Sequence, residues 1–167
     1  MATAETLSDV LTNLEAVPRT YNGAINSVGK LRIQTGTLEA TTGHTTGKII
    51  ALCKVPAAAS VKSIKLYLDA LTSGAVDVGL YTGPSSSNLT VADVDAYASA
   101  VAVGGGADKA GLEVSFEARD IANINKLVYE DCSDSVGDFS EYWICMTVTT
   151  GIGAGGTISY RVEYVNE

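Results

Sequence analysis

Strict alternation of apolar and polar residues between positions 64 and 80 is the feature that most limits how this chain can fold. A period of two belongs to β-strands that bury one face, because successive side chains of a strand point to opposite sides. Gly74 lies between two alternating runs and permits a tight reversal, so the pattern predicts a β-hairpin. The apolar members of the two runs are Ile64, Leu66, Leu68, Val76, Val78 and Leu80.

Other segments also have the character of strands. An apolar strand over 49–56 precedes the predicted hairpin, and a Thr-rich strand over 29–38 is expected at a sheet edge. Alternation over 112–118 predicts a further half-buried strand. Two closing strands, over 142–148 and 158–164, flank a glycine-rich loop and are predicted to form a C-terminal hairpin.

Helical spacing is found in fewer places. Apolar residues recur every three to four positions over 90–103, which predicts a short helix. Over 119–131 the spacing does not separate a helical turn from a short strand, and the segment fits one running into the other. The rest of the chain after position 28 favours strands.

About eight short strands, separated by turns rich in Gly, Ser and Thr, predict an all-β fold, a β-sandwich of jelly-roll type. An immunoglobulin-like sandwich is less favoured, because the chain has no Cys…Trp…Cys spacing. A length of 167 residues suits one domain with a full hydrophobic core. The sandwich is therefore placed over residues 28–167, after an N-terminal arm, helical or extended, over residues 1–27.

The arm begins with an amphipathic stretch over 4–16, which Pro18 ends. The residues at helical spacing within it are Leu7, Val10, Leu11 and Leu14. An extended connector over 17–23 follows. Because an isolated helix this short is marginal in water, its leucines need a surface to pack on. That surface belongs to the domain itself, to a sister subunit or to another protein, and the sequence leaves the three open.

Charge and composition exclude several classes of partner. The formal net charge of −8 repels phosphate backbones and anionic lipids, so neither nucleic acid nor a membrane surface is expected as a partner. No leader and no membrane-spanning run is visible, which indicates synthesis in a cytoplasm. Cys53, Cys132 and Cys145 are odd in number and widely spaced, so neither a disulfide framework nor a zinc site is expected.

Motifs that could support catalysis or cofactor binding are weak. Residues 151–156 match the GxGxxG fingerprint, but a strand follows where a dinucleotide site needs a helix, so a hairpin loop is favoured. His44, the single histidine, lies in a Thr-Gly turn. The chain contains neither a nucleophile elbow nor a Walker loop. We therefore expect no enzyme, no catalytic residue and no cofactor.

Two further clusters admit a binding function. An acidic run over 130–141 could hold calcium, but it lacks the spacing of an EF-hand loop, so a solvated loop without a metal is favoured. Trp143 and the tyrosines could form a sugar-binding platform. However, Trp143, Tyr160 and Tyr164 fall within predicted strands, where aromatic residues usually pack on neighbours or at oligomer contacts.

Three stretches carry a resemblance to a known family. They are the apolar strand from Ile49 through Lys54 and Val55-Pro56 to Val61, the run Ala75-Val-Asp-Val-Gly-Leu, and the closing run Gly156-Thr-Ile-Ser-Tyr-Arg-Val-Glu-Tyr-Val. From Ile49 onward the chain resembles the head decoration (cement) proteins and related structural proteins of tailed bacteriophages. The resemblance implies a non-enzymatic virion component on the capsid exterior, commonly a homotrimer, that stabilises the capsid by bridging major capsid subunits.

Under this resemblance the arm is expected to supply the partner contacts, because an unpacked amphipathic helix and its connector need a receiving surface. The expected contact residues are Leu7, Leu11, Leu14, Arg19 and Tyr21. The alternative from another class is a carbohydrate- or receptor-binding β-sandwich module of a virion or cell surface. Exposed, coplanar aromatic rings would favour that alternative, and buried rings would count against it.

Overall fold

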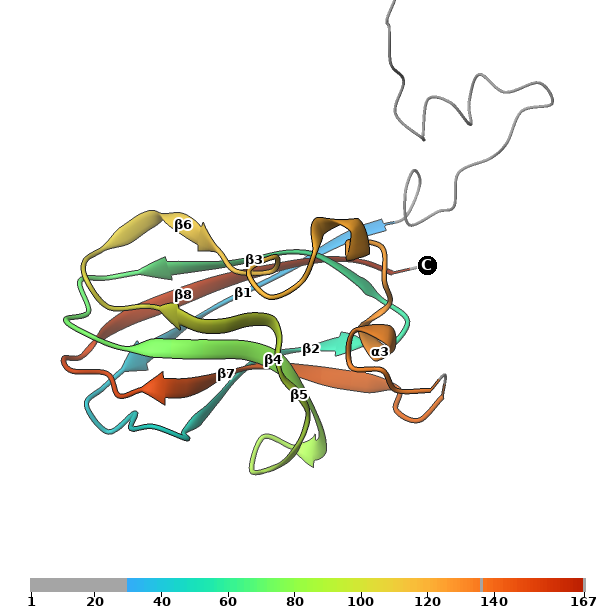
Figure 1. Cartoon of the computed structure of the whole chain (residues 1–167), viewed down its shortest axis with the longest axis horizontal. Coiled ribbons are helices and arrows are strands. Elements are labelled where there is room, and N and C mark those ends of the chain that lie inside the picture. The colour runs from blue at the N-terminus through green and yellow to red at the C-terminus, as the bar shows by residue number, and fades with distance from the viewer. Residues whose placement is uncertain (1–29, 136, 167) are drawn as a thin grey trace, which may run out of the picture.

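The computed structural model describes residues 30–135 and 137–166, which fold into two facing antiparallel β-sheets (Figure 1). Sheet A has the strand order β1-β8-β3-β6 and sheet B the order β2-β7-β4-β5. The strands are β1 (Lys30–Ala40), β2 (Ile49–Pro56), β3 (Ser60–Leu68), β4 (Ala75–Ser85), β5 (Asn88–Ala102), β6 (Asp108–Glu113), β7 (Glu141–Thr150) and β8 (Gly156–Asn166). The predicted all-β sandwich is confirmed, and β1 lies at a sheet edge as predicted.

Most connections between consecutive strands cross from one sheet to the other. Among the described strands, β4 and β5 are the only consecutive pair in one sheet. Two four-stranded sheets connected in this way form a sandwich of the jelly-roll type. Two predicted hairpins are therefore wrong, because β3 and β4 lie in different sheets and so do β7 and β8. A strand with one buried face has the same alternation whether its sequence neighbour lies beside it or across the core.

The helix predicted over 90–103 is also wrong, because this segment is strand β5. The register between β4 and β5 is interrupted at several points, so extra residues move the apolar positions out of a period of two. Their spacing then becomes three to four, which resembles a helix. At one interruption the backbone of β5 lies against Gly79, where an added Cβ would be 2.2 Å from the carbonyl oxygen of Asp93.

The strand predicted over 112–118 is mostly wrong, because only Leu112 and Glu113 belong to a strand, β6, which begins earlier at Asp108. Strand β6 stops at Glu113, whose carboxylate accepts hydrogen bonds from the backbone amides of Ile64 and Ser115. These bonds take the place of a continued ladder. The ambiguous segment 119–131 then forms a 3-10 turn, η1 (Ile121–Asn123), and a short helix, α3 (Val128–Asp131), with no strand.

The hydrophobic core lies between the two sheets. Its fully buried members include Val55, Val61, Ile64, Leu66, Val76, Val78, Leu80, Ile144, Met146, Ile158 and Val162. Burying one such side chain contributes about 1.5–3 kcal/mol. In the part of the chain that the structure describes, no helix is long and apolar enough to cross a membrane.

Candidate functional site

The predicted arm contacts lie outside the described residues, which begin at Lys30. They are Leu7, Leu11, Leu14, Arg19 and Tyr21, and their role stays a prediction, as does the boundary between arm and sandwich. The described element that follows the arm directly is the edge strand β1.

Strand β1 exposes two large apolar side chains, with Leu31 54% and Ile33 55% exposed. Because side chains alternate along a strand, Gln34 and Leu38 face the sandwich interior while the odd-numbered residues point away from it. These odd-numbered residues, Leu31, Ile33, Thr35, Thr37 and Glu39, are here called the β1 outer face. An exposed apolar pair on an edge strand makes this face the candidate assembly surface.

Side chains that link the two sheets hold β1 in place. The amide nitrogen Nε2 of Gln34 donates to the carbonyl oxygen of Lys54 in β2 at 2.7 Å and to the hydroxyl oxygen of Tyr164 at 3.1 Å. The hydroxyl of Tyr160 donates to the carbonyl oxygen of Leu52 in β2 at 2.6 Å. Strand β1 and its neighbour β8 are thus fixed relative to sheet B, so the β1 outer face has a defined position.

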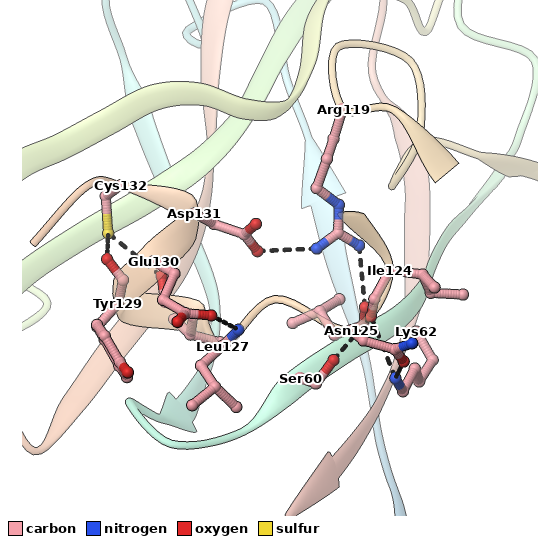
Figure 2. Close-up of polar contacts among 12 residues, drawn as sticks. Ser60, Lys62, Arg119, Ile124, Asn125, Leu127, Tyr129, Glu130, Asp131 and Cys132 are labelled. Atoms are coloured by element: carbon pink, nitrogen blue, oxygen red, sulfur yellow. Dashed lines mark hydrogen bonds and ion pairs between the residues drawn. The ribbon is translucent and has the colours of Figure 1, made fainter. Parts of the chain in front are cut away.

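A buried ion pair organises the segment that crosses the end of the sandwich where β2 turns into β3 (Figures 1 and 2). Arg119 donates from Nη1 to Oδ2 of Asp131 at 2.8 Å and from Nη2 to the carbonyl oxygen of Val61 at 2.9 Å. Its guanidinium lies 4.9 Å from the ring centre of Tyr97 and 5.0 Å from that of Phe116. Burial raises the pKa of Asp131, and the charge of Arg119 opposes this shift.

Figure 2 shows further polar contacts that fasten the same segment to β3. Ser60 Oγ donates to the carbonyl oxygen of Ile124 at 2.7 Å, and Lys62 Nζ donates to the same oxygen at 3.1 Å. Glu130 accepts from the backbone amide of Leu127 at 2.8 Å and so caps the start of α3. Arg119 is not among the residues predicted from the sequence, where its only signal is one basic residue beside a strand-like apolar run.

The acidic run over 130–141 has protein partners. Besides Glu130 and Asp131, Asp134 accepts from the Tyr142 hydroxyl at 2.7 Å and Asp138 accepts from the Ser135 amide at 2.8 Å. Glu141 pairs with Lys54 at 3.1 Å. Within residues 30–135 and 137–166, no group of three or more His, Cys, Asp or Glu side chains could hold a metal ion. These carboxylates hold the loop together.

The aromatic residues do not gather into a platform in the described part of the chain. Tyr81, Tyr97 and Tyr142 are at most 1% exposed. Trp143 lines an open hollow of about 370 Å³, but the ammonium of Lys54 lies 4.6 Å from its ring centre. Its indole nitrogen donates to the carbonyl oxygen of Gly83 at 3.0 Å. One ring face and the polar atom of Trp143 are therefore already engaged, which counts against a sugar-binding platform.

Residues considered for catalysis have structural contacts. The Nδ1 atom of His44 accepts from the backbone amide of Thr41 at 2.9 Å, within the turn between β1 and β2. A strand, β8, follows the glycine-rich segment 151–156, as expected, but this segment crosses from sheet B to sheet A and is not the predicted hairpin loop. Burial raises the pKa of the Cys53 and Cys145 thiols to about 12, so both are protonated at neutral pH.

Among solved structures, chains from two phage capsids are similar to this chain. A chain in the capsid of Ralstonia phage GP4 has a TM-score of 0.62 and 18% identity, with 83% of this chain and 86% of that chain covered. A chain in the cyanophage Pam1 capsid asymmetric unit has a TM-score of 0.48 and 16% identity, with 99% and 100% covered. The first likeness shows a shared fold. No protein-family model and no curated protein matches the sequence.

Proposed function

We propose that this chain is a non-enzymatic structural protein of a phage virion, which decorates the capsid exterior and stabilises it by bridging major capsid subunits. The observation that carries the proposal is the fold shared with a chain in the capsid of Ralstonia phage GP4, at a TM-score of 0.62 over 83% of this chain. The resemblance of the sequence from Ile49 onward to head decoration proteins supports the same class.

The contacts of the chemically versatile side chains agree with a structural role. Arg119 and Asp131 compensate each other's charge inside the fold. The carboxylates of the run 130–141 bind backbone amides, a tyrosine hydroxyl or a lysine of the same chain. Each of these groups has a partner within the same chain, and this supports the non-enzymatic part of the proposal.

A decoration protein stabilises a shell by mass action, because it binds the assembled lattice and not the separated subunits. Many copies, each with a modest contact area, then raise the stability of the whole shell. In this proposal the arm, residues 1–27, reaches a neighbouring subunit, and the sandwich, residues 28–167, holds the arm at a fixed place. The arm contacts are Leu7, Leu11, Leu14, Arg19 and Tyr21. The chain is made in the host cytoplasm and assembles there on the shell.

The proposed partners are the major capsid protein and further copies of this chain, for which the resemblance implies a homotrimer. The net charge of −8 disfavours contact with packaged nucleic acid or a membrane. A carbohydrate- or receptor-binding module is less well supported, because Lys54 covers one face of Trp143 and three tyrosine rings are buried. Binding to a glycan array at micromolar affinity would favour that module instead.

The test is binding of the purified chain to capsids of the encoding phage that were prepared without it. We expect the full chain to sediment with the capsids at a fixed ratio to the major capsid protein, and to raise the temperature at which they disrupt. A chain without residues 1–22 should lose both effects, whereas Val91→Asp, which adds a charge to the edge strand β5 and keeps residues 1–22, should keep them. No binding of the full chain would refute the proposed function, and undiminished binding of the shortened chain would refute only the arm contacts.

A further inference from the structure

Sheet edges are sites where a second chain can add a strand, and proteins normally protect them with short strands, bulges, prolines or charges. Three of the four edges in the described sandwich are protected. Strand β6 has six residues and a register shift, and β5 is bulged at several points. Strand β2 is bulged next to Ala51 and ends at Pro56. Its carbonyl oxygens at Leu52 and Lys54 already accept side-chain hydrogen bonds from sheet A.

Strand β1 lacks these protections. Its 11 residues pair with β8 in an unbroken register from Lys30 opposite Asn166 to Ala40 opposite Gly156. It contains no proline, and its charged residues lie only near the two ends. Within the described residues, no strand other than β8 bonds to its backbone. A long, regular and open edge with two exposed apolar side chains is the form that accepts a further strand.

We propose that β1 pairs with β1 of a second copy of this chain, antiparallel about a two-fold axis, so that the two sheets A join into one continuous sheet. The distribution of charge along β1 favours a second copy of β1 as the added strand, in the antiparallel direction. Lys30 and Arg32 lie at the start of β1 and Glu39 lies near its end. Parallel pairing would set Lys30 beside Lys30 and Glu39 beside Glu39 of the second copy, and like charges on neighbouring strands repel each other. Antiparallel pairing avoids this and brings the basic start of each strand to the same end of the ladder as the acidic end of the other, with Glu39 on the β1 outer face and Lys30 and Arg32 on the opposite face.

The register of the pairing follows from full overlap. With Lys30 opposite Ala40 of the second copy, the axis passes through Thr35. Ile33 then lies opposite Thr37 of the second copy, and Leu31 opposite Glu39 of the second copy. Both apolar side chains of the β1 outer face thereby gain neighbours across the new ladder. Because both copies use the same edge, the assembly is a closed dimer with no free β1 edge.

This inference goes beyond the proposed function and does not depend on it. It gives a dimer as the free form of the chain, in place of the homotrimer that the resemblance implies. A two-fold axis at Thr35 also requires that Leu31 of one copy lies opposite Glu39 of the other. Within one copy the same two positions are separated by about 27 Å of extended strand.

The experiment measures the mass of the full chain by light scattering over a range of concentrations, for the wild type and three variants. The wild type should be a dimer. Leu31→Asp should weaken the dimer by about tenfold or more, because it places a carboxylate opposite Glu39 of the second copy. The double variant Leu31→Asp with Glu39→Lys should restore the dimer, since opposite charges then face each other. Val91→Asp is the matched control, since Val91 is 53% exposed on the edge strand β5, and it should leave the dimer intact.

Hydrogen exchange of the wild type provides a second measurement that needs no variant. The amides of β1 should exchange more slowly as concentration rises, whereas those of the edge strand β6 should not change. A monomeric or trimeric wild type would overturn the proposal, and so would a dimer that Leu31→Asp leaves unchanged. Failure of Glu39→Lys to restore the dimer would overturn the register.

Discussion

Replacing Arg119 with methionine should strongly destabilise the fold. The side chains of Arg119 and Asp131 are only 4% and 2% exposed, and their ion pair measures 2.8 Å. Methionine keeps much of the apolar stem but removes the charge. Asp131 then remains buried without its ion-pair partner, and the carbonyl oxygen of Val61 loses a donor. Removing one member of such a pair typically costs 3–5 kcal/mol, or about a third of the stability of an average domain.

The cost of Arg119→Met should depend on pH. Burial raises the pKa of Asp131, and Arg119 opposes this shift, so the variant raises that pKa further. An aspartate whose pKa is higher in the folded state than in the unfolded state is destabilising when it is ionised. Folding stability is therefore lost as pH rises from the unfolded pKa through the folded pKa. The deficit of the variant should be smaller at about pH 5 than at about pH 7.

The assay is urea unfolding at both pH values, followed by the fluorescence of Trp143, the single tryptophan. The matched control is the double variant Arg119→Met with Asp131→Leu, which removes both charges. It should recover to within about 1–2 kcal/mol of the wild type, because apolar residues often replace a buried ion pair at little cost. A loss below about 1 kcal/mol in the single variant, or a double variant as unstable as the single one, would refute the reasoning.

Two further predictions concern close packing and a buried carboxylate. Gly79→Ala should destabilise by about 3 kcal/mol, because its Cβ would lie 2.2 Å from the backbone oxygen of Asp93, whereas Gly43→Ala, with its nearest contact at 3.4 Å, should change stability little. Equal stabilities of these two variants in urea would show that β5 does not lie against β4 as described. Burial alone would raise the pKa of Glu113, but hydrogen bonds from Ser115, Ser63 and two backbone amides lower it overall, so its contribution to stability is present above the unfolded pKa and is lost as pH falls through the folded one. Glu113→Gln should therefore cost stability at about pH 7 and less at about pH 3, and a deficit that grows on acidification would contradict this.

Most of the strands could be predicted from the sequence, because burial of one face imposes a period of two. The alternating residues between Ile64 and Leu80 are buried as expected. The partners of these strands could not be predicted in the same way. A hairpin and a crossing between sheets both join two strands with one buried face, so β3 and β4 looked like neighbours. The bulges of β5 had a similar effect, since they removed the period on which its recognition depends.

The roles of Arg119 and Asp131 could not be read from local pattern. The two residues are twelve positions apart. They meet only because the segment between them folds over the turn from β2 to β3, where Val128 donates to the carbonyl oxygen of Ala59. An acidic residue in a polar run is expected to be solvated, but the side chain of Asp131 is only 2% exposed. Burial and a contact with a residue distant in sequence therefore determine the pKa of Asp131, although its neighbours in sequence are polar.

The orientation of β1 shows why the candidate surface was hidden in the sequence. Leu31 and Ile33 alternate with polar residues, which would ordinarily place them in the core. The structure points Gln34 inward instead, where its amide donates to the carbonyl oxygen of Lys54 in sheet B and to the hydroxyl oxygen of Tyr164 on the neighbouring strand β8. A buried amide is tolerated when it is hydrogen-bonded, so the inward face of β1 is satisfied without its apolar pair. Leu31 and Ile33 are left on an open edge, where a second chain can bury them.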